Sequence, residues 1–200
     1  MSLEKEWARW HRERVSALTA PYGPLFMLSA RDTPPSDPSP LAPGGLLRVP
    51  LVASGTPLTT AQRLLAEQEG TVAGEPDYGS IEVFRPHPDH VVPARFTSSD
   101  DSGLDGTLSF SLGGHEHQLV VSRQPRGDLH ATFGDPSRQG VFPYRFVQMP
   151  EPDERGDTVI DFNRVVLPIA AFSSRPPERE APPQNQLTVA LEAGEHRWLT

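Results

Sequence analysis

The stretch Val159-Ile160-Asp161-Phe162-Asn163-Arg164-Val165-Val166 places three polar side chains among apolar ones. We interpret it as a β-strand, in which successive side chains point to opposite faces. Asp161 and Asn163 then share one face, while Arg164 lies on the other, which carries the larger apolar side chains and is the predicted core face. A guanidinium on that face needs a paired anion or several acceptors, because an unpaired buried charge is very costly. The strand is therefore predicted to border a polar pocket or an internal ion pair.

Turn sequences divide the chain from residue 80 to residue 192 into short apolar segments, and we predict an antiparallel β core there. The predicted strands are Ile81–Arg85, Val91–Thr97, Thr107–Leu112, Gln118–Ser122, Leu129–Phe133, Tyr144–Met149, Thr158–Asn163 and Leu187–Leu191. The pair Gly113-Gly114 is a good signal for a hairpin turn. Short strands at a spacing of about ten residues are typical of a sandwich or a barrel. The predicted fold class is mainly β with a minor α+β character, an antiparallel β-barrel or β-sandwich.

The rest of the chain is predicted to surround this core, with residues 1–200 forming a single domain. Residues 1–20 favour an N-terminal helix whose Trp7 and Trp10 lie on one side, against the body of the domain. Leu46–Val52 is compatible with a strand, and Thr59–Glu69 with one further short helix. Two segments are rich in proline: a loop at residues 33–45, and an arm at residues 175–185 that we expect to cross the surface in extended form.

Composition excludes several classes of function. The net charge is −8 and no basic cluster is present, which argues against nucleic acid as a partner. No apolar run approaches the ~20 residues of a membrane span, and the charged N-terminus lacks the apolar core of a signal peptide. Cysteine is absent, so disulfides, thiolate catalysis and Cys-ligated zinc are excluded. We expect a cytoplasmic protein with no membrane partner and no cofactor, and leave its oligomeric state open.

Few residues form a recognisable catalytic or metal-binding pattern. His87 and His90 flank one turn, and His115 and His117 bracket another, with a spacing that can suit a metal. All four lie in or beside turns, where surface histidines are common, and we predict no metal site. No serine lies in the Gly-x-Ser-x-Gly elbow of hydrolases, and no glycine-rich phosphate loop is present.

The polar residues near the C-terminus carry the functional hypothesis. The candidate ligand-binding residues are Arg145, Asp161, Asn163, Arg164 and Asn185. Arginine forks suit carboxylates, so a small anionic molecule is the candidate ligand, received by Arg145 or Arg164 at the mouth of a barrel.

Three alternatives stand beside this hypothesis. In the first, the same residues form an internal network, in which Asp161 or Asp135 pairs an arginine and Asn185 ties the tail to the sheet. The second is a hydrolase-like enzyme that uses Asp161 or a histidine at the same pocket. The third is a protein-interaction module that docks through the Trp helix or the proline-rich arms.

Both ends and the middle of the chain resemble the bacterial family known as domain of unknown function 1684. The resemblance lies in Asp161-Phe162-Asn163-Arg164, Pro168, Phe172, Pro182-Pro183, Asn185, Glu192-Ala193-Gly194-Glu195, Phe133-Gly134-Asp135, Phe142-Pro143-Tyr144-Arg145-Phe146, Trp10-His11, Arg14-Val15 and Leu18–Leu25. It implies a shared fold, and no activity comes with it.

The chain departs from the family pattern in two places. Pro168-Ile169-Ala170-Ala171 stands where members often carry Pro-Pro-Cys, so no role of that cysteine applies here. Pro136-Ser137-Arg138-Gln139 replaces a turn that resembles Thr-Ser-Gly in the family.

Overall fold

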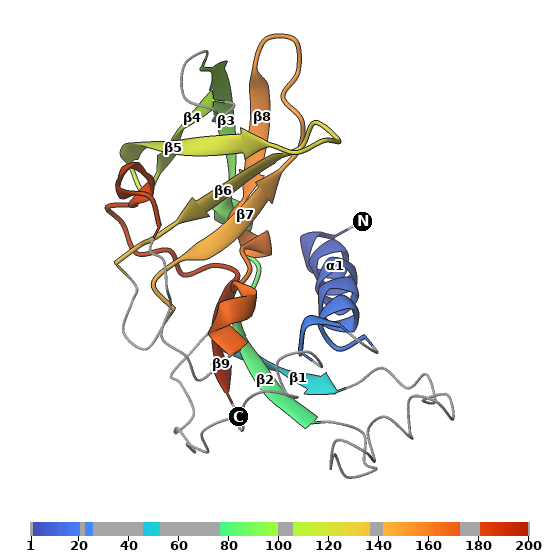
Figure 1. The fold of residues 1–200 in the computed structure, drawn as a ribbon. Coiled ribbons are helices and arrows are strands. Elements are labelled where there is room, and N and C mark those ends of the chain that lie inside the picture. Colours follow the sequence, from blue (N-terminus) through green and yellow to red (C-terminus); the bar gives the residue numbers. More distant parts are fainter. Residues whose placement is uncertain are drawn as a thin grey trace.

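The computed structural model describes residues 2–20, 23–25, 46–52, 77–99, 106–136, 142–172 and 181–199. Within these residues the protein is mainly β, with one long helix, α1 (Leu3–Leu18), near its N-terminus (Figure 1). The strands are β1 (Leu46–Val52), β2 (Asp77–Phe84), β3 (Val91–Ser98), β4 (Gly106–Leu112), β5 (His115–Arg123), β6 (Leu129–Phe133), β7 (Arg145–Met149), β8 (Asp157–Asp161) and β9 (Glu195–Leu199). The predicted fold class is confirmed.

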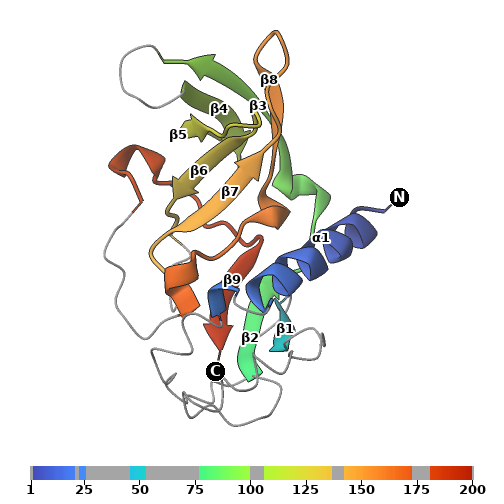
Figure 2. The ribbon, with the colours of Figure 1, turned by 45° about the vertical axis from the view of Figure 1, so that its right-hand side comes forward.

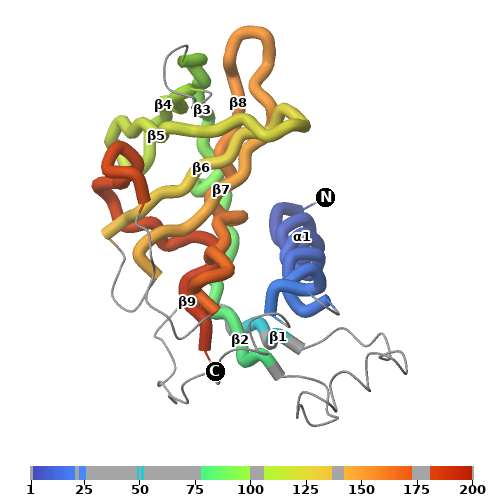
Figure 3. Tube along the Cα trace, in the orientation of Figure 1, coloured from blue at the N-terminus to red at the C-terminus, as the bar shows by residue number. Residues whose placement is uncertain are grey.

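Six strands, in the order β7-β6-β5-β4-β3-β8, form an antiparallel sheet that curls into a half-barrel. The predicted hairpin at Gly113-Gly114 joins β4 to β5, and both glycines have the positive φ that such a two-residue turn requires, 61° and 79°. The edge strands β7 and β8 are consecutive in the chain, and Figure 3 traces the connection between them. The two ends of that connection lie close together, and Thr158 Oγ1 donates a hydrogen bond to the Pro150 carbonyl at 3.0 Å.

Alternate residues of these strands fill the half-barrel. Burial alternates along β4, β6 and β7, as expected for a sheet with one covered face. The buried apolar residues are Val92, Ala94, Leu108, Phe110, Leu112, Leu119, Val121, Leu129, Ala131, Phe133, Val147, Met149, Ile160, Phe162, Val165, Leu187, Leu191 and Ala193. The last three belong to the C-terminal segment, which therefore completes this core from a distant part of the sequence.

A second core lies between α1 and the small sheet β1-β2-β9, and we call these four elements the helix layer. Figure 2 shows α1 running from beside the half-barrel, at its N-terminal end, toward β2 and β1. The buried residues of this core are Trp7, Leu18, Leu25, Leu51, Tyr78, Ile81, Val83, Leu167 and Phe172. Trp7 is 8% exposed, so the predicted contact of the tryptophan helix with the body of the protein is confirmed.

The strand predicted through Val166 ends at Asp161, and this changes the faces of the residues that follow. The Asp161 carboxylate accepts a hydrogen bond from the Asn163 N–H at 3.1 Å and caps a 3-10 turn, η2 (Phe162–Arg164). Side chains of this kind offer the backbone an alternative to the sheet ladder. Asn163 is consequently buried, 1% exposed, while the Arg164 side chain is 39% exposed. The predicted burial of Arg164 is wrong.

Two further predictions near the C-terminus need correction. Leu187–Leu191 forms no strand. Gln186 makes a single parallel bridge to Gly134, and the residues after it contribute side chains to the half-barrel core without pairing along a strand. The described part of the proline-rich arm contains a 3-10 turn, η4 (Pro183–Asn185), so it is not extended as predicted. It does lie at the surface, because Pro182, Pro183 and Gln184 are exposed, while Asn185 is buried.

Several other predictions are not tested by the structure. The loop at residues 33–45, the helix at Thr59–Glu69 and the first part of the arm lie outside the described residues. The organisation of residues 1–200 as one domain is also a prediction.

Candidate functional site

The five candidate residues fall into three separate groups of contacts. Asp161, Asn163 and Arg164 lie together at the end of β8, where η2 turns the chain toward α1. Arg145, the first residue of β7, contacts Asp135 and the C-terminal segment. Asn185 lies in η4 against β5 and β6.

Asn163 uses its polar atoms for internal contacts. Its side-chain oxygen accepts from the His87 N–H at 2.9 Å, and its amide nitrogen donates to the His87 carbonyl at 3.0 Å. The same nitrogen donates to Asp161 at 2.9 Å, and the Asn163 carbonyl accepts from Trp7 Nε1 at 2.8 Å. Asn163 therefore links α1, η2 and the chain entering β3, and it has no group left for a ligand.

Arg164 is held on two sides and open on a third. Its Nε lies 3.0 Å from Asp161 Oδ2, and its guanidinium carbon lies 5.9 Å from the centre of the Trp10 ring. No hydrogen bond joins its terminal nitrogens, Nη1 and Nη2, to any described residue. The contact of Nε with Asp161 is an ion pair without hydrogen-bond geometry. The exposed edge of the guanidinium has the shape and charge that suit a carboxylate.

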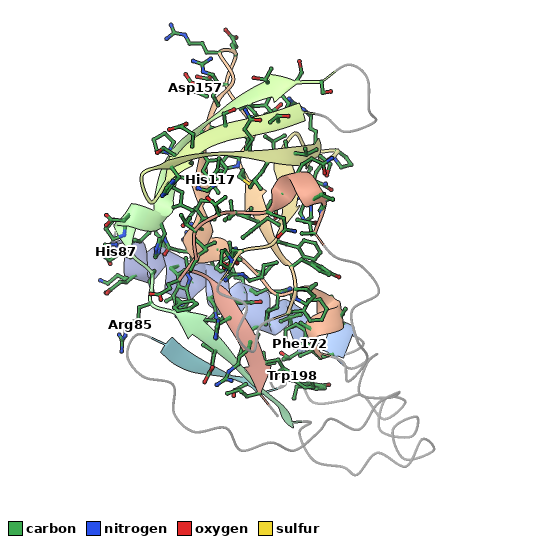
Figure 4. The ribbon with its side chains drawn as sticks, turned by 90° about the vertical axis from the view of Figure 1, so that its left-hand side faces the viewer. Arg85, His87, His117, Asp157, Phe172 and Trp198 are labelled. Carbon is green, nitrogen blue, oxygen red and sulfur yellow. The ribbon has the colours of Figure 1, made fainter. Side chains whose placement is uncertain are left out.

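Histidines lie close to this turn. His87 is exposed, His90 is half-buried, and their rings are 6.0 Å apart. Burial and the neighbouring His87 lower the pKa of His90, while Asn163, Asp89 and Glu192 oppose that shift. Figure 4 labels His87 and Asp157 far apart, because Asp157 begins β8 whereas His87 lies beside the turn that follows β8.

The second predicted histidine pair is divided between two environments. His115 is exposed, whereas His117 is 7% exposed and stacks on Phe110 with the ring centres 5.6 Å apart. Its Nε2 is buried and has no hydrogen-bond partner among the residues that the structure describes. In the described part of the chain, no group of three or more His, Asp or Glu residues has an arrangement that could hold a metal ion.

Arg145 belongs to the inside of the protein. Its side chain is 2% exposed, donates to Asp135 Oδ2 at 2.8 Å, and donates to the carbonyls of Leu191, Ala193 and Glu195 at 2.7 to 3.1 Å. Burial lowers the pKa of Arg145, and the carboxylates of Asp135 and Glu195 oppose the shift. The charge is thus satisfied internally, and Arg145 ties the C-terminal segment to the half-barrel.

Asn185 has the same kind of role. Its amide nitrogen donates to the Val120 and Thr132 carbonyls, both at 2.8 Å, and its oxygen accepts from the Val120 N–H at 2.7 Å. It therefore ties the tail to β5 and β6. The alternative of an internal network, weighed on the sequence, describes Arg145, Asp135 and Asn185 correctly.

A buried charged cluster beneath α1 was missed by the sequence analysis. Glu195 is fully buried, and its carboxylate accepts from the Leu167 N–H at 2.7 Å and from Arg14 at 3.2 and 3.4 Å. His11, 3% exposed, places its Nε2 3.6 Å from the same carboxylate and stacks on Trp7, with ring centres 4.9 Å apart.

The electrostatics of this cluster keep Glu195 ionised. Burial alone would raise the pKa of Glu195, but His11, Arg14 and the Leu167 N–H outweigh it and lower the pKa below its ordinary value. One signal for the cluster was present in the sequence, because His11 follows Trp7 by four residues and precedes Arg14 by three, on one helical face. Nothing in the sequence indicated that Glu195 is buried.

The comparisons with known proteins identify a family and name no activity. The sequence profile of a family described as "Protein of unknown function (DUF1684)" matches residues 76–196. The chain belongs to this family. The matched region contains β2 to β8 and the beginning of β9, whereas α1 and β1 lie before it. The resemblance based on Asp161 to Arg164 is thereby confirmed, and the part based on Trp10 to Leu25 lies outside the match.

No curated protein matches this chain. Among solved structures, it is similar to the solution NMR structure of an uncharacterized protein from Haloarcula marismortui. The two chains are 26% identical, the alignment covers 58% of this chain and 76% of the other, and the TM-score is 0.49.

The segment Pro168-Ile169-Ala170-Ala171 lies beside the second core, with Ile169 and Ala170 exposed. Ile169–Phe172 forms a 3-10 turn, η3, and Phe172 packs against Trp198 with ring centres 5.9 Å apart. The two side chains lie together at the lower end of Figure 4.

No helix in the described ranges has the length and apolar character needed to cross a membrane.

Proposed function

We propose that this protein binds a small molecule through a carboxylate, and that Arg164 is the residue that receives it. The observation that carries the proposal is the partly exposed guanidinium of Arg164. It pairs with Asp161, lies over the Trp10 ring, and leaves 39% of its side chain exposed. These two neighbours restrict the side chain, which reduces the conformational entropy lost when an anion binds.

The other candidate residues support Arg164 without touching the ligand. Asp161 orients the guanidinium, and Asn163 holds the turn against α1 and the chain before β3. The side chains of Arg145 and Asn185 are engaged in internal hydrogen bonds, so we assign them no direct contact with the ligand. His87 and His90 lie near enough to Asn163 to form the rim of the same surface.

The two other hypotheses have weaker support. A hydrolase that uses Asp161 would need a free carboxylate, but both oxygens of Asp161 already contact Asn163 and Arg164. An interaction module that uses the tryptophans would need them at the surface, but Trp7 is buried and its Nε1 is hydrogen-bonded.

A thermal-shift screen tests the proposal, with acetate, succinate and citrate compared against sodium chloride at matched ionic strength. A carboxylate that raises the melting temperature is then titrated by calorimetry against wild type and Arg164→Met. We expect the affinity to fall about tenfold or more, since a charge-assisted fork is lost.

Two variants serve as controls. Arg95→Met removes an exposed arginine that pairs with Asp157 at the other end of β8, and it should bind as wild type does. Arg164→Lys keeps the charge and loses the fork, so it should bind more weakly than wild type. No response to any carboxylate, or equal losses in Arg164→Met and Arg95→Met, would refute the proposal.

A further inference from the structure

Helix α1 depends on its docking contacts more than on its own sequence. Its N-cap residue, Ser2, makes no side-chain capping bond, and its last turn carries no basic residue that would favour the helix dipole. A lone helix of 16 residues is marginal in water. The docked state is therefore what keeps α1 helical, and release from the body would also unfold it.

Among the described residues, the polar docking contacts of α1 and its two buried apolar residues lie on one face of the helix. Trp7 Nε1 donates to the Asn163 carbonyl, and Arg14 Nη2 donates to the Leu167 carbonyl at 2.9 Å. Arg14 and His11 both face the buried carboxylate of Glu195. Leu18, 1% exposed, supplies the apolar contact at the end of the helix.

The same helix carries one wall of the Arg164 site. Trp10 lies on α1 and contacts the Arg164 guanidinium, while Trp7 holds the carbonyl of the neighbouring Asn163. Undocking of α1 removes both contacts together. The ladder of the half-barrel strands β4, β5 and β6 is formed by pairing between the strands themselves, so we expect it to persist when α1 is released.

We propose that α1 is a latch whose docking onto Glu195 completes the ligand site at Arg164. In the docked state Trp10 and Asp161 hold the guanidinium from two sides, and in the released state only Asp161 remains. Ligand binding and helix docking then favour each other, because coupling between two equilibria is reciprocal. The ligand part of this inference rests on the proposed function, whereas the latch itself does not.

Hydrogen–deuterium exchange on the full-length protein tests the latch without any ligand. Arg14→Gln removes the contacts to Glu195 and Leu167, and the α1 amides should then exchange about tenfold faster or more, since charge-assisted bonds are lost. The amides of β4 and β5 should keep their protection. The matched control is Arg12→Gln, which changes an exposed arginine of the same helix and should leave α1 as in wild type.

Two outcomes would overturn the latch. In one, Arg14→Gln leaves the protection of α1 unchanged. In the other, α1 and the half-barrel lose protection together, which would mean that they open as one unit. Glu195→Gln, with the exposed Glu192→Gln as its control, checks the same contact from the other partner.

Citrate as probe tests the coupling. At ten times its dissociation constant, it should slow exchange of the α1 amides about tenfold in wild type and have no effect in Arg164→Met. Binding of citrate without slower exchange of α1 would show that the helix is not part of the site. Absence of carboxylate binding in wild type would refute the proposed function alone and leave the exchange result on Arg14→Gln standing.

Discussion

The half-barrel and the helix layer each bury an apolar face, but they are assembled from differently spaced parts of the chain. In the half-barrel, β3 to β8 are consecutive antiparallel strands, and neighbours in the sheet are mostly neighbours in the chain. In the helix layer, α1, β1, β2 and β9 come from distant parts of the sequence. The helix layer therefore has to be joined by contacts that are long-range in sequence.

Buried polar and charged groups lie where these long-range joins occur. Glu195 attaches α1, Arg145 attaches the C-terminal segment, and Asn163 attaches both α1 and the chain before β3. By contrast, the ion pairs on the outside of the half-barrel, such as Arg95 with Asp157, are exposed. The comparison teaches that buried polar groups in this protein fix the relative placement of segments, whereas apolar alternation forms the sheet itself.

The largest effect should come from the join inside the half-barrel. Arg145→Met removes the guanidinium that donates to Asp135 and to three carbonyls. It should cost about 3–5 kcal/mol of the free energy of unfolding, since removing one partner of a buried ion pair is strongly destabilising. Arg95→Met should cost less than about 1 kcal/mol, because that pair is exposed. Urea unfolding followed by circular dichroism measures both. Equal costs would remove the distinction between buried joins and surface pairs.

Acid should release the helix layer before the half-barrel. The pKa of Glu195 is lowered in the folded protein, so its contribution to docking is complete above the unfolded value of about 4.5. The contribution is lost as the pH falls below that value and through the folded pKa. The groups that face this carboxylate are His11 and Arg14 from α1 and the Leu167 N–H, with Arg145 nearby.

Exchange of the α1 amides as a function of pH, corrected for intrinsic rates, measures this release. Wild type should lose protection in α1 below a pH of about 4.5, whereas Glu195→Gln should have weaker protection at neutral pH and a flatter profile. An identical profile in both proteins would assign the acid sensitivity to another group.

A smaller effect is expected from one hydrogen bond between the two regions. Trp7→Phe removes the donor to the Asn163 carbonyl and should cost about 1–2 kcal/mol. Trp198→Phe is the matched control, since Trp198 Nε1 donates to the Tyr78 carbonyl within the helix layer. Both variants should lose similar stability in urea, but only Trp7→Phe should weaken ligand binding at Arg164. Loss of binding in both would point to a general loosening of the layer.

The smallest effect on stability is expected at Arg164. Because its side chain is partly exposed, Arg164→Met should change the free energy of unfolding by less than about 1 kcal/mol even with Asp161 intact. This reverses the expectation from the sequence, in which a buried Arg164 would make the single substitution costly. Urea unfolding decides between the two, and a loss of about 3 kcal/mol or more would restore the buried interpretation.

The sequence located several strands of the half-barrel closely but placed Arg164 on the wrong face, and both results have the same physical reason. Strand alternation and turn residues are local signals, so β3, β4, β6 and the Gly113-Gly114 hairpin could be located closely. The face of Arg164 depended on whether the strand continues past Asp161. A carboxylate that caps its own backbone ended the strand, and that competition cannot be read from alternation.

The amino-acid sequence by itself determined that this protein is mainly β, that a tryptophan helix precedes the sheet, and that the chain belongs with its family through Asp161 to Arg164. These follow from periodicity, turn chemistry and motif, which are properties of neighbouring residues. Only the tertiary structure decided which charges are buried. Arg145 is internal and Arg164 is open, and Glu195 meets His11 and Arg14 across more than 180 positions of sequence. Such partners become neighbours only when two separate cores are packed together, and a local pattern does not record that packing.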